Sequence, residues 1–236
     1  MRYEVNVEIG EETMRGLKDE GYSLYAFKAV KSSSKSGMPT VWFAMDNYLT
    51  NMSIGWTEKY RAYISIDDLI PNGIISTHTD KDIDFQQTMN VDKYGICDVV
   101  SGGIKEGIVI NDVGDIPYTC GVSAQKRDGT YSTLCAFKLH GKNADLIVPI
   151  EKVLLMFATE IVETQTVLEK SLGPGILIDL TGVTQRNVSY DIDKGWHWGD
   201  DESWAREIPA NSQLSPLLTQ FSIDLQKQVR QMGFVE

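Results

Sequence analysis

Apolar and polar residues alternate along much of the chain, and this period of two constrains the fold more than any other feature. The pattern first appears at residues 3–8, Tyr-Glu-Val-Asn-Val-Glu, and returns at residues 59–66. Successive side chains of a β-strand point to opposite faces of the sheet, so alternation predicts strands with one buried face. We therefore expect a mostly β protein, an antiparallel β-sandwich in which two similar sheets pack face to face.

The second half of the chain contains the clearest local prediction, a β-hairpin. Residues 118–126 and 131–139 both have the composition of strands, and Asp128-Gly129 lies in the turn between them. Asp-Gly is favoured in tight hairpin turns because these need positive φ angles. A short helix is expected over residues 11–20. The other predicted strands are residues 22–31, 40–45, 51–56, 59–66, 74–79, 82–91, 107–111 and 175–181.

Residues 146–167 are compatible with two structures. The run Val-Leu-Leu-Met-Phe-Ala at residues 153–158 fits either a buried helix or a strand covered on both faces. The β-branched residues at 162–167 favour strands. We expect strands throughout this stretch, ended by the Gly-Pro-Gly sequence at residues 173–175.

An amphipathic helix is predicted at the C-terminus, over residues 215–233. Ser215 is a suitable N-cap, Pro216 suits the first helical position, and Gly233 suits the C-terminal cap. We expect this helix to pack on the sandwich through an apolar stripe formed by Leu217, Leu218, Phe221, Leu225, Val229 and Met232. Residues 1–236 should form one β-rich domain, with residues 1–92 and 93–210 as candidate sub-units.

Charge excludes some classes of partner. The net charge of −11, from 33 acidic and 22 basic residues, opposes binding to a phosphate backbone, so nucleic acid is not expected as a partner. The basic residues are scattered, apart from Lys28, Lys31 and Lys35 around one serine-rich loop. No polybasic membrane patch is therefore predicted.

The cysteines and the apolar runs bear on the cellular compartment. Cys97, Cys120 and Cys135 are odd in number and lack CxxC spacing, so we expect buried thiols rather than disulfides or a zinc site. The acidic residues near the N-terminus do not fit a signal peptide, and no run of apolar residues is long enough for a transmembrane helix. We expect a soluble cytoplasmic protein, or one released without a signal peptide. The sequence predicts no particular oligomeric state, and a homo-oligomer is one of the options.

Residues 189–204 are unusually rich in both aromatic and acidic residues. Apolar faces of sugars stack on aromatic rings, and carboxylates accept hydrogen bonds from sugar hydroxyls, so this composition is typical of a saccharide site. The alternative is that the rings anchor an irregular segment over the end of a sheet. The predicted ligand-binding residues in this stretch are Tyr190, Asp191, Asp193, Trp196, Trp198 and Trp204.

The acidic residues of the same stretch permit two further interpretations. Asp191, Asp193, Asp200, Asp201 and Glu202 could offer oxygens to Ca²⁺, but their spacing does not match the twelve-residue calcium loop, so no metal site is predicted. Two of these carboxylates could also act as a glycosidase pair, which depends on a separation that a sequence does not reveal.

A second aromatic group lies in the first half of the chain. If Tyr60 points inward from its strand, Tyr63 points outward, and an exposed tyrosine beside Trp56 would suit a contact with lipid or sugar. Core packing is the alternative for these rings. Trp56 and Tyr63 complete the set of predicted ligand-binding residues.

No motif for catalysis is present. The three histidines, His78, His140 and His197, lack a neighbouring nucleophile motif, and no phosphate-binding or dinucleotide-binding loop occurs. The sequence therefore predicts no catalytic residue and no cofactor. It favours a non-catalytic recognition protein of lectin or toxin type that binds a glycan or membrane-surface ligand. The alternatives are a pore-forming toxin that inserts a β-hairpin from residues 147–167, and a carbohydrate-active enzyme using acids near Trp196 and Trp198.

Overall fold

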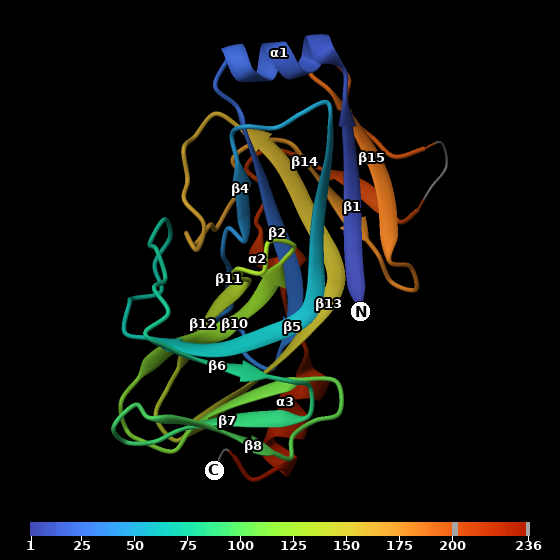
Figure 1. Cartoon of the computed structure of the whole chain (residues 1–236). Coiled ribbons are helices and arrows are strands. Elements are labelled where there is room, and N and C mark those ends of the chain that lie inside the picture. Colours follow the sequence, from blue (N-terminus) through green and yellow to red (C-terminus); the bar gives the residue numbers. More distant parts are fainter. Residues whose placement is uncertain (200–202, 235–236) are drawn as a thin grey trace.

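The computed structural model describes residues 1–199 and 203–234, and these form two mixed sheets of nine strands each (Figure 1). In the first sheet, the strands run in the order β16-β15-β1-β5-β10-β12-β3, with β6 on β5 and β11 on β10. Its members are β1 (Arg2–Ile9), β3 (Met38–Pro39), β5 (Asn51–Ser65), β6 (Thr79–Ile83), β10 (Tyr118–Lys126), β11 (Tyr131–Thr133), β12 (Cys135–Leu139), β15 (Gln185–Asp191) and β16 (Gly195–His197).

The second sheet runs in the order β17-β14-β13-β9-β7-β8, and β2 joins β13, β4 and β18. Its members are β2 (Ser23–Ser32), β4 (Phe43–Met45), β7 (Gln87–Val91), β8 (Cys97–Ser101), β9 (Ile108–Asp112), β13 (Asn143–Ala158), β14 (Gly175–Asp179), β17 (Ala205–Ile208) and β18 (Thr219–Phe221). The β-sandwich with a C-terminal helix is thus confirmed. Most strand pairs are antiparallel, but β1–β15, β7–β9 and β2–β18 are parallel.

The main core lies between the two sheets. The inward side chains of β1 and β5 meet those of β13 and β14 in one buried cluster, in which Val5, Trp56, Phe157 and Ile176 are fully or almost fully buried. Burial of this apolar surface is the largest favourable contribution to folding. The alternation seen in the sequence therefore produces the layer that holds the sheets together.

Three strand predictions differ from the structure. Residues 51–56 and 59–66 form one strand, β5, whose first half pairs with β1 and whose second half pairs with β6 and β10. Residues 82–91 divide into β6 and β7 at Gln86, which has φ 66°, and these two strands belong to different sheets. Apart from its last residue, which begins β6, the predicted strand at 74–79 is a loop holding one isolated bridge at Ile74.

Residues 146–167 are a strand only in their first part. Residues 146–158 belong to β13, which is hydrogen-bonded to β2, β9 and β14. Residues 159–167 are a loop with isolated bridges. The strand assignment is therefore confirmed for β13, and the segment is not a two-stranded hairpin in this structure.

The predicted C-terminal helix is interrupted. Ser215–Leu218 form the short helix α2, Thr219–Phe221 form β18, and Ile223–Gln231 form the helix α3. Thr219 donates a hydrogen bond from Oγ1 to Gly37 O at 2.8 Å, and β18 pairs with β2. These tertiary bonds outweigh the helical preference of the segment. The N-cap of α3 is Ser222, whose side chain accepts a hydrogen bond from Leu225 N.

The predicted sub-units 1–92 and 93–210 do not coincide with the sheets. Each sheet contains strands from both halves, and the boundary separates β7 from β8, which pair with each other. The predicted helix in the first half is confirmed as α1 (Glu11–Asp19), and the predicted hairpin is confirmed as β10 with β11 and β12. None of the helices in the described parts of the chain has the length and apolar character needed to cross a bilayer.

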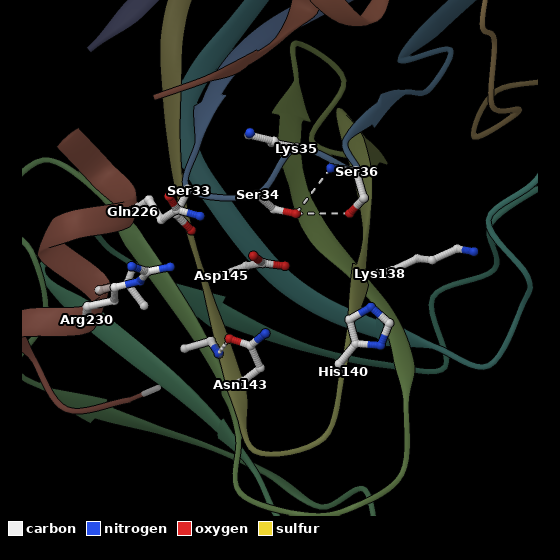
Figure 2. A pocket seen from close by; sticks show the side chains of 12 residues that line it. Ser33, Ser34, Lys35, Ser36, Lys138, His140, Asn143, Asp145, Gln226 and Arg230 are labelled. Atoms are coloured by element: carbon white, nitrogen blue, oxygen red, sulfur yellow. Dashed lines mark hydrogen bonds between the residues drawn. The ribbon is translucent and has the colours of Figure 1, made fainter. Parts of the chain in front are cut away.

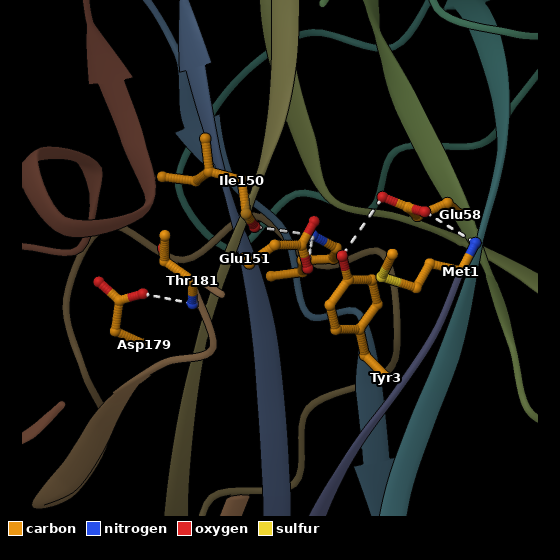
Figure 3. Close-up of polar contacts among 8 residues, drawn as sticks. Met1, Tyr3, Glu58, Ile150, Glu151, Asp179 and Thr181 are labelled. Atoms are coloured by element: carbon orange, nitrogen blue, oxygen red, sulfur yellow. Dashed lines mark hydrogen bonds and ion pairs between the residues drawn. The ribbon is translucent and has the colours of Figure 1, made fainter. Parts of the chain in front are cut away.

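An ion pair joins Lys28 of β2 to the half-buried Glu151 of the neighbouring strand β13 (Figure 3). Lys28 has no exposed surface, donates a hydrogen bond from Nζ to Ile150 O at 2.7 Å, and lies 3.7 Å from Glu151 Oε2. Its ammonium group also lies 5.5 Å from the centroid of the Trp56 ring. Burial lowers the pKa of Lys28 to about 8 and raises that of Glu151. Desolvation therefore outweighs the mutual attraction of the two charges.

Gly121 in β10 has no room for a side chain. A Cβ atom built there would approach Cys135 O and would lie 2.7 Å from Tyr63 Oη. We expect Gly121→Ala to lower the free energy of unfolding by about 1 to 3 kcal/mol, because a backbone carbonyl cannot move aside cheaply. Urea unfolding followed by tryptophan fluorescence measures this. Gly129→Ala, in the turn after β10, is the comparison: its φ of 87° gives strain without a clash. An unchanged unfolding midpoint for Gly121→Ala would contradict the packing described here.

Candidate functional site

Residues 189–197 of the aromatic and acidic segment belong to the β15–β16 hairpin at one edge of the first sheet. Tyr190, Asp191 and Trp196 line a single surface hollow of about 470 Å³ there. Glu8 of β1 and His197 of β16 line it as well, and both are exposed. Three of the predicted ligand-binding residues are therefore brought together. The hollow joins two carboxylates, an imidazole and the accessible parts of two aromatic rings, which is the chemistry that sugar hydroxyls and sugar faces require.

The rings of this hairpin also belong to the core. Trp196 is only 5% exposed, and its ring stacks on Phe157 with a centroid distance of 5.6 Å. Tyr190 lies 4.9 Å from Trp196 and 4.7 Å from Phe157, centroid to centroid. Most of the Trp196 ring is therefore used to anchor the segment on the sheet, as the alternative interpretation predicted. A ligand would meet only the remaining part of that ring.

The other predicted residues of the segment lie outside the lining of this hollow. Asp193 is exposed in the turn, where its amide donates to Asp191 Oδ1 at 3.1 Å. Trp198 and Trp204 are half-buried, and the Arg186 guanidinium lies 4.5 Å from the centroid of the Trp204 ring. The acids proposed as calcium ligands at positions 200–202, namely Asp200, Asp201 and Glu202, lie outside the described residues.

Trp56 and Tyr63 are fully buried, so the expectation that they are exposed is wrong. The Trp56 ring stacks on Tyr3 and meets Trp42 edge to face. Tyr63 donates a hydrogen bond to Cys135 O at 2.7 Å, within a second apolar cluster beneath the loop that follows β5. Both faces of β5 are covered there, and the inference from alternation assumed that one face meets solvent.

Sequence reasoning missed a second pocket, of about 370 Å³, at the opposite end of the molecule from the hairpin (Figures 1 and 2). The loop after β2 forms one wall, the end of β12 and the start of β13 form another, and α3 closes the side. Its acidic and basic residues are Asp145, Lys35, Lys138, His140 and Arg230. A sequence signal existed only for Asp145, an acid within the apolar stretch of β13. The basic residues come from segments far apart in the chain.

Asp145 is the chemically unusual group of this second pocket. It is 7% exposed, and among the described residues its carboxylate receives a hydrogen bond only from the Cys120 thiol, at 3.7 Å. Burial raises the pKa of Asp145 to about 7. Across the same residues, its carboxylate takes part in no ion pair.

Within the described ranges 1–199 and 203–234, no group of three or more histidine, cysteine, aspartate or glutamate side chains is close enough to hold a metal ion. The three cysteines are free and buried, and burial raises the pKa of each thiol. A raised thiol pKa disfavours the nucleophilic thiolate.

Comparison with known proteins adds no assignment. No protein-family model, curated protein or solved structure matches the chain significantly.

Proposed function

We propose that the chain is a non-catalytic recognition protein of lectin type that binds a glycan in the hollow beside the β15–β16 hairpin. One observation carries the proposal: Tyr190, Asp191 and Trp196, selected from the sequence for sugar chemistry, line the same hollow as Glu8 and His197. The volume of about 470 Å³ lies within the range of small-ligand pockets and suits one or two sugar units.

The roles in this proposal follow from exposure. Glu8 and His197 accept and donate hydrogen bonds at the rim, while Tyr190 and Trp196 offer the edges of their rings to an apolar sugar face. Asp191 Oδ1 already accepts from Asp193 N and Lys194 N, at 3.1 and 3.0 Å, which holds the turn in place. Its other oxygen supplies the acceptor for a ligand hydroxyl.

A glycan array followed by calorimetry on the best hit tests the proposal. Asp191→Asn keeps a turn acceptor but removes the charge, and His197→Ala removes an exposed side chain. We expect each to weaken binding about tenfold, equivalent to about 1.4 kcal/mol. Asp193→Asn is the matched control, because Asp193 lies two residues away and does not line the hollow; it should bind as the unchanged protein does. Trp196→Ala is unsuitable, since removing a core ring costs about 3 to 5 kcal/mol of stability.

Two results would reject the proposal. One is an array without a hit, and the other is equal weakening by Asp191→Asn and Asp193→Asn. Release of a reducing sugar from the bound glycan would replace the proposal with the glycosidase alternative. Dye release from liposomes would favour the toxin alternative instead.

We also propose that the protein works in a reducing compartment such as the cytoplasm. The support is that Cys97, Cys120 and Cys135 are all free and buried. A homo-oligomer would present several hairpin hollows to one glycan surface and raise its avidity. Cell fractionation tests the compartment, and sedimentation velocity tests whether the protein is a homo-oligomer.

A further inference from the structure

The Asp145 pocket contains a buried carboxyl group with almost no internal partner. Figure 2 shows the Asp145 carboxylate in the middle of the pocket, between Arg230 on α3 and His140 after β12. A buried carboxylate normally accepts several hydrogen bonds or pairs with a cation, because leaving it unsatisfied is costly. The Cys120 thiol supplies one weak hydrogen bond, at 3.7 Å from Oδ2, and no charge. The group that satisfies Asp145 therefore has to come from a ligand or from solvent in the pocket.

The rim of this pocket is basic in a protein that carries a net charge of −11. Lys138, His140 and Arg230 are exposed there, and neither Lys138 nor Arg230 forms an ion pair with any described residue. Lys35 is also at the rim, with its ammonium group 5.0 Å from the centroid of the Phe221 ring. Figure 2 shows Arg230 on one side of Asp145 and Lys138 with His140 on the other. Guanidinium and ammonium groups without an internal partner are suited to bind an oxyanion.

Between the rim and Asp145 the lining is neutral and polar. Ser34 and Ser36 lie at 2.9 Å from each other through their Oγ atoms, and Gln226 faces them from α3. Asn143 uses Oδ1 to accept from Ala144 N at 2.8 Å, so it offers Nδ2 to a ligand. These groups match hydroxyls, which both donate and accept.

The serine loop is held in place before any ligand arrives. Ser33 N donates to Leu146 O at 3.0 Å, and Leu146 N donates to Ser33 Oγ at 2.9 Å, which ties the loop to β13 beside Asp145. Ser34 N also donates to Ser32 Oγ at 2.9 Å. A site that is ordered in advance loses less entropy on binding.

We propose that this pocket binds a phosphorylated sugar, with the phosphate among Lys138, His140 and Arg230 and the hydroxyls against Asp145. A simple anion would leave Asp145 to solvent alone, and a simple cation would be repelled at the rim. An amino acid would satisfy both charges but would find little apolar surface for its side chain, since Ala144 and Val229 are the only apolar residues among the described ones that line the pocket. The volume of about 370 Å³ suits a single sugar phosphate.

Calorimetry on the full chain tests this proposal with glucose, mannose and fructose 6-phosphates. At least one of them should bind about tenfold or more tightly than both the parent hexose and inorganic phosphate. Arg230→Gln and Lys138→Gln should each weaken that binding about tenfold and leave the weak binding of the hexose unchanged. Lys59→Gln removes an exposed charge outside the pocket and is the matched control. Asp145→Asn should weaken the sugar phosphate and the hexose alike.

The inference is overturned if none of the three hexose 6-phosphates binds, or if inorganic phosphate or a free amino acid binds as tightly as they do. It is also overturned if Lys59→Gln weakens the binding of the hexose 6-phosphate as much as Arg230→Gln does. The hairpin proposal is tested independently, because Asp191→Asn should not alter sugar phosphate binding and Arg230→Gln should not alter glycan binding.

Discussion

Replacing Lys28 with methionine is expected to lower the free energy of unfolding by about 3 to 5 kcal/mol, because the change leaves the buried Oε2 atom of the half-buried Glu151 without its cation. Lys28 has no exposed surface, and its bond to Ile150 O is lost as well. The Glu151 Oε2 atom already lacks a hydrogen-bond partner among the described residues. Chemical denaturation at pH 7 measures the change.

A double variant separates the charge from the packing. Lys28→Met combined with Glu151→Leu removes both charges and keeps apolar volume, so it should recover most of the lost stability. Desolvation is the largest cause of the pKa shift of both partners, and it lowers the pKa of Lys28 and raises that of Glu151, so each is pushed toward its neutral form. A single Lys28→Met variant as stable as the unchanged protein would show that Lys28 is not buried as described.

Asp145→Asn is expected to stabilise the protein above pH 7, by about 2 to 4 kcal/mol for a pKa raised from 3.8 to about 7. Between these pH values the folded state holds a proton that the unfolded state has released. Stability therefore falls as pH rises through this window, and the loss is complete above pH 7. The asparagine side chain does not ionise, so the variant escapes this loss. Thermal unfolding at pH 4 and pH 8 measures it, and the two proteins should differ little at pH 4.

Comparing the Asp145→Asn variant with the unchanged protein removes the contribution of every other titrating group. Burial also raises the pKa of Asp112, but Asp112 is present in both proteins and its contribution cancels. A variant that is more stable and yet binds the sugar phosphate more weakly would mark Asp145 as a residue kept for binding at the expense of stability. Identical pH profiles for both proteins would mean that Asp145 reaches solvent.

Sequence reasoning predicted the hairpin of β10 with β11 and β12 because its turn is local: Asp128-Gly129 needs no distant partner, and Gly129 has φ 87°. It also predicted that Tyr190, Asp191 and Trp196 act at one place, since they lie close together in the chain. It failed for Trp56 and Tyr63, because alternation does not reveal whether a second layer covers the outer face of a strand. Sequence reasoning could not predict the Asp145 pocket, because the lining of that pocket comes from α3, the loop after β2 and the start of β13.

The amino-acid sequence alone determined that this chain is a β-sandwich, where its clearest hairpin turns, and that a helix lies near its C-terminus. These depend on side-chain periodicity and turn chemistry, which act over a few residues. Only the tertiary structure decided the division of residues 215–231 into α2, β18 and α3, the burial of Lys28, and the meeting of Asp145 with distant basic residues. Each depends on contacts between segments far apart in the chain, and such contacts leave no periodic trace in the sequence.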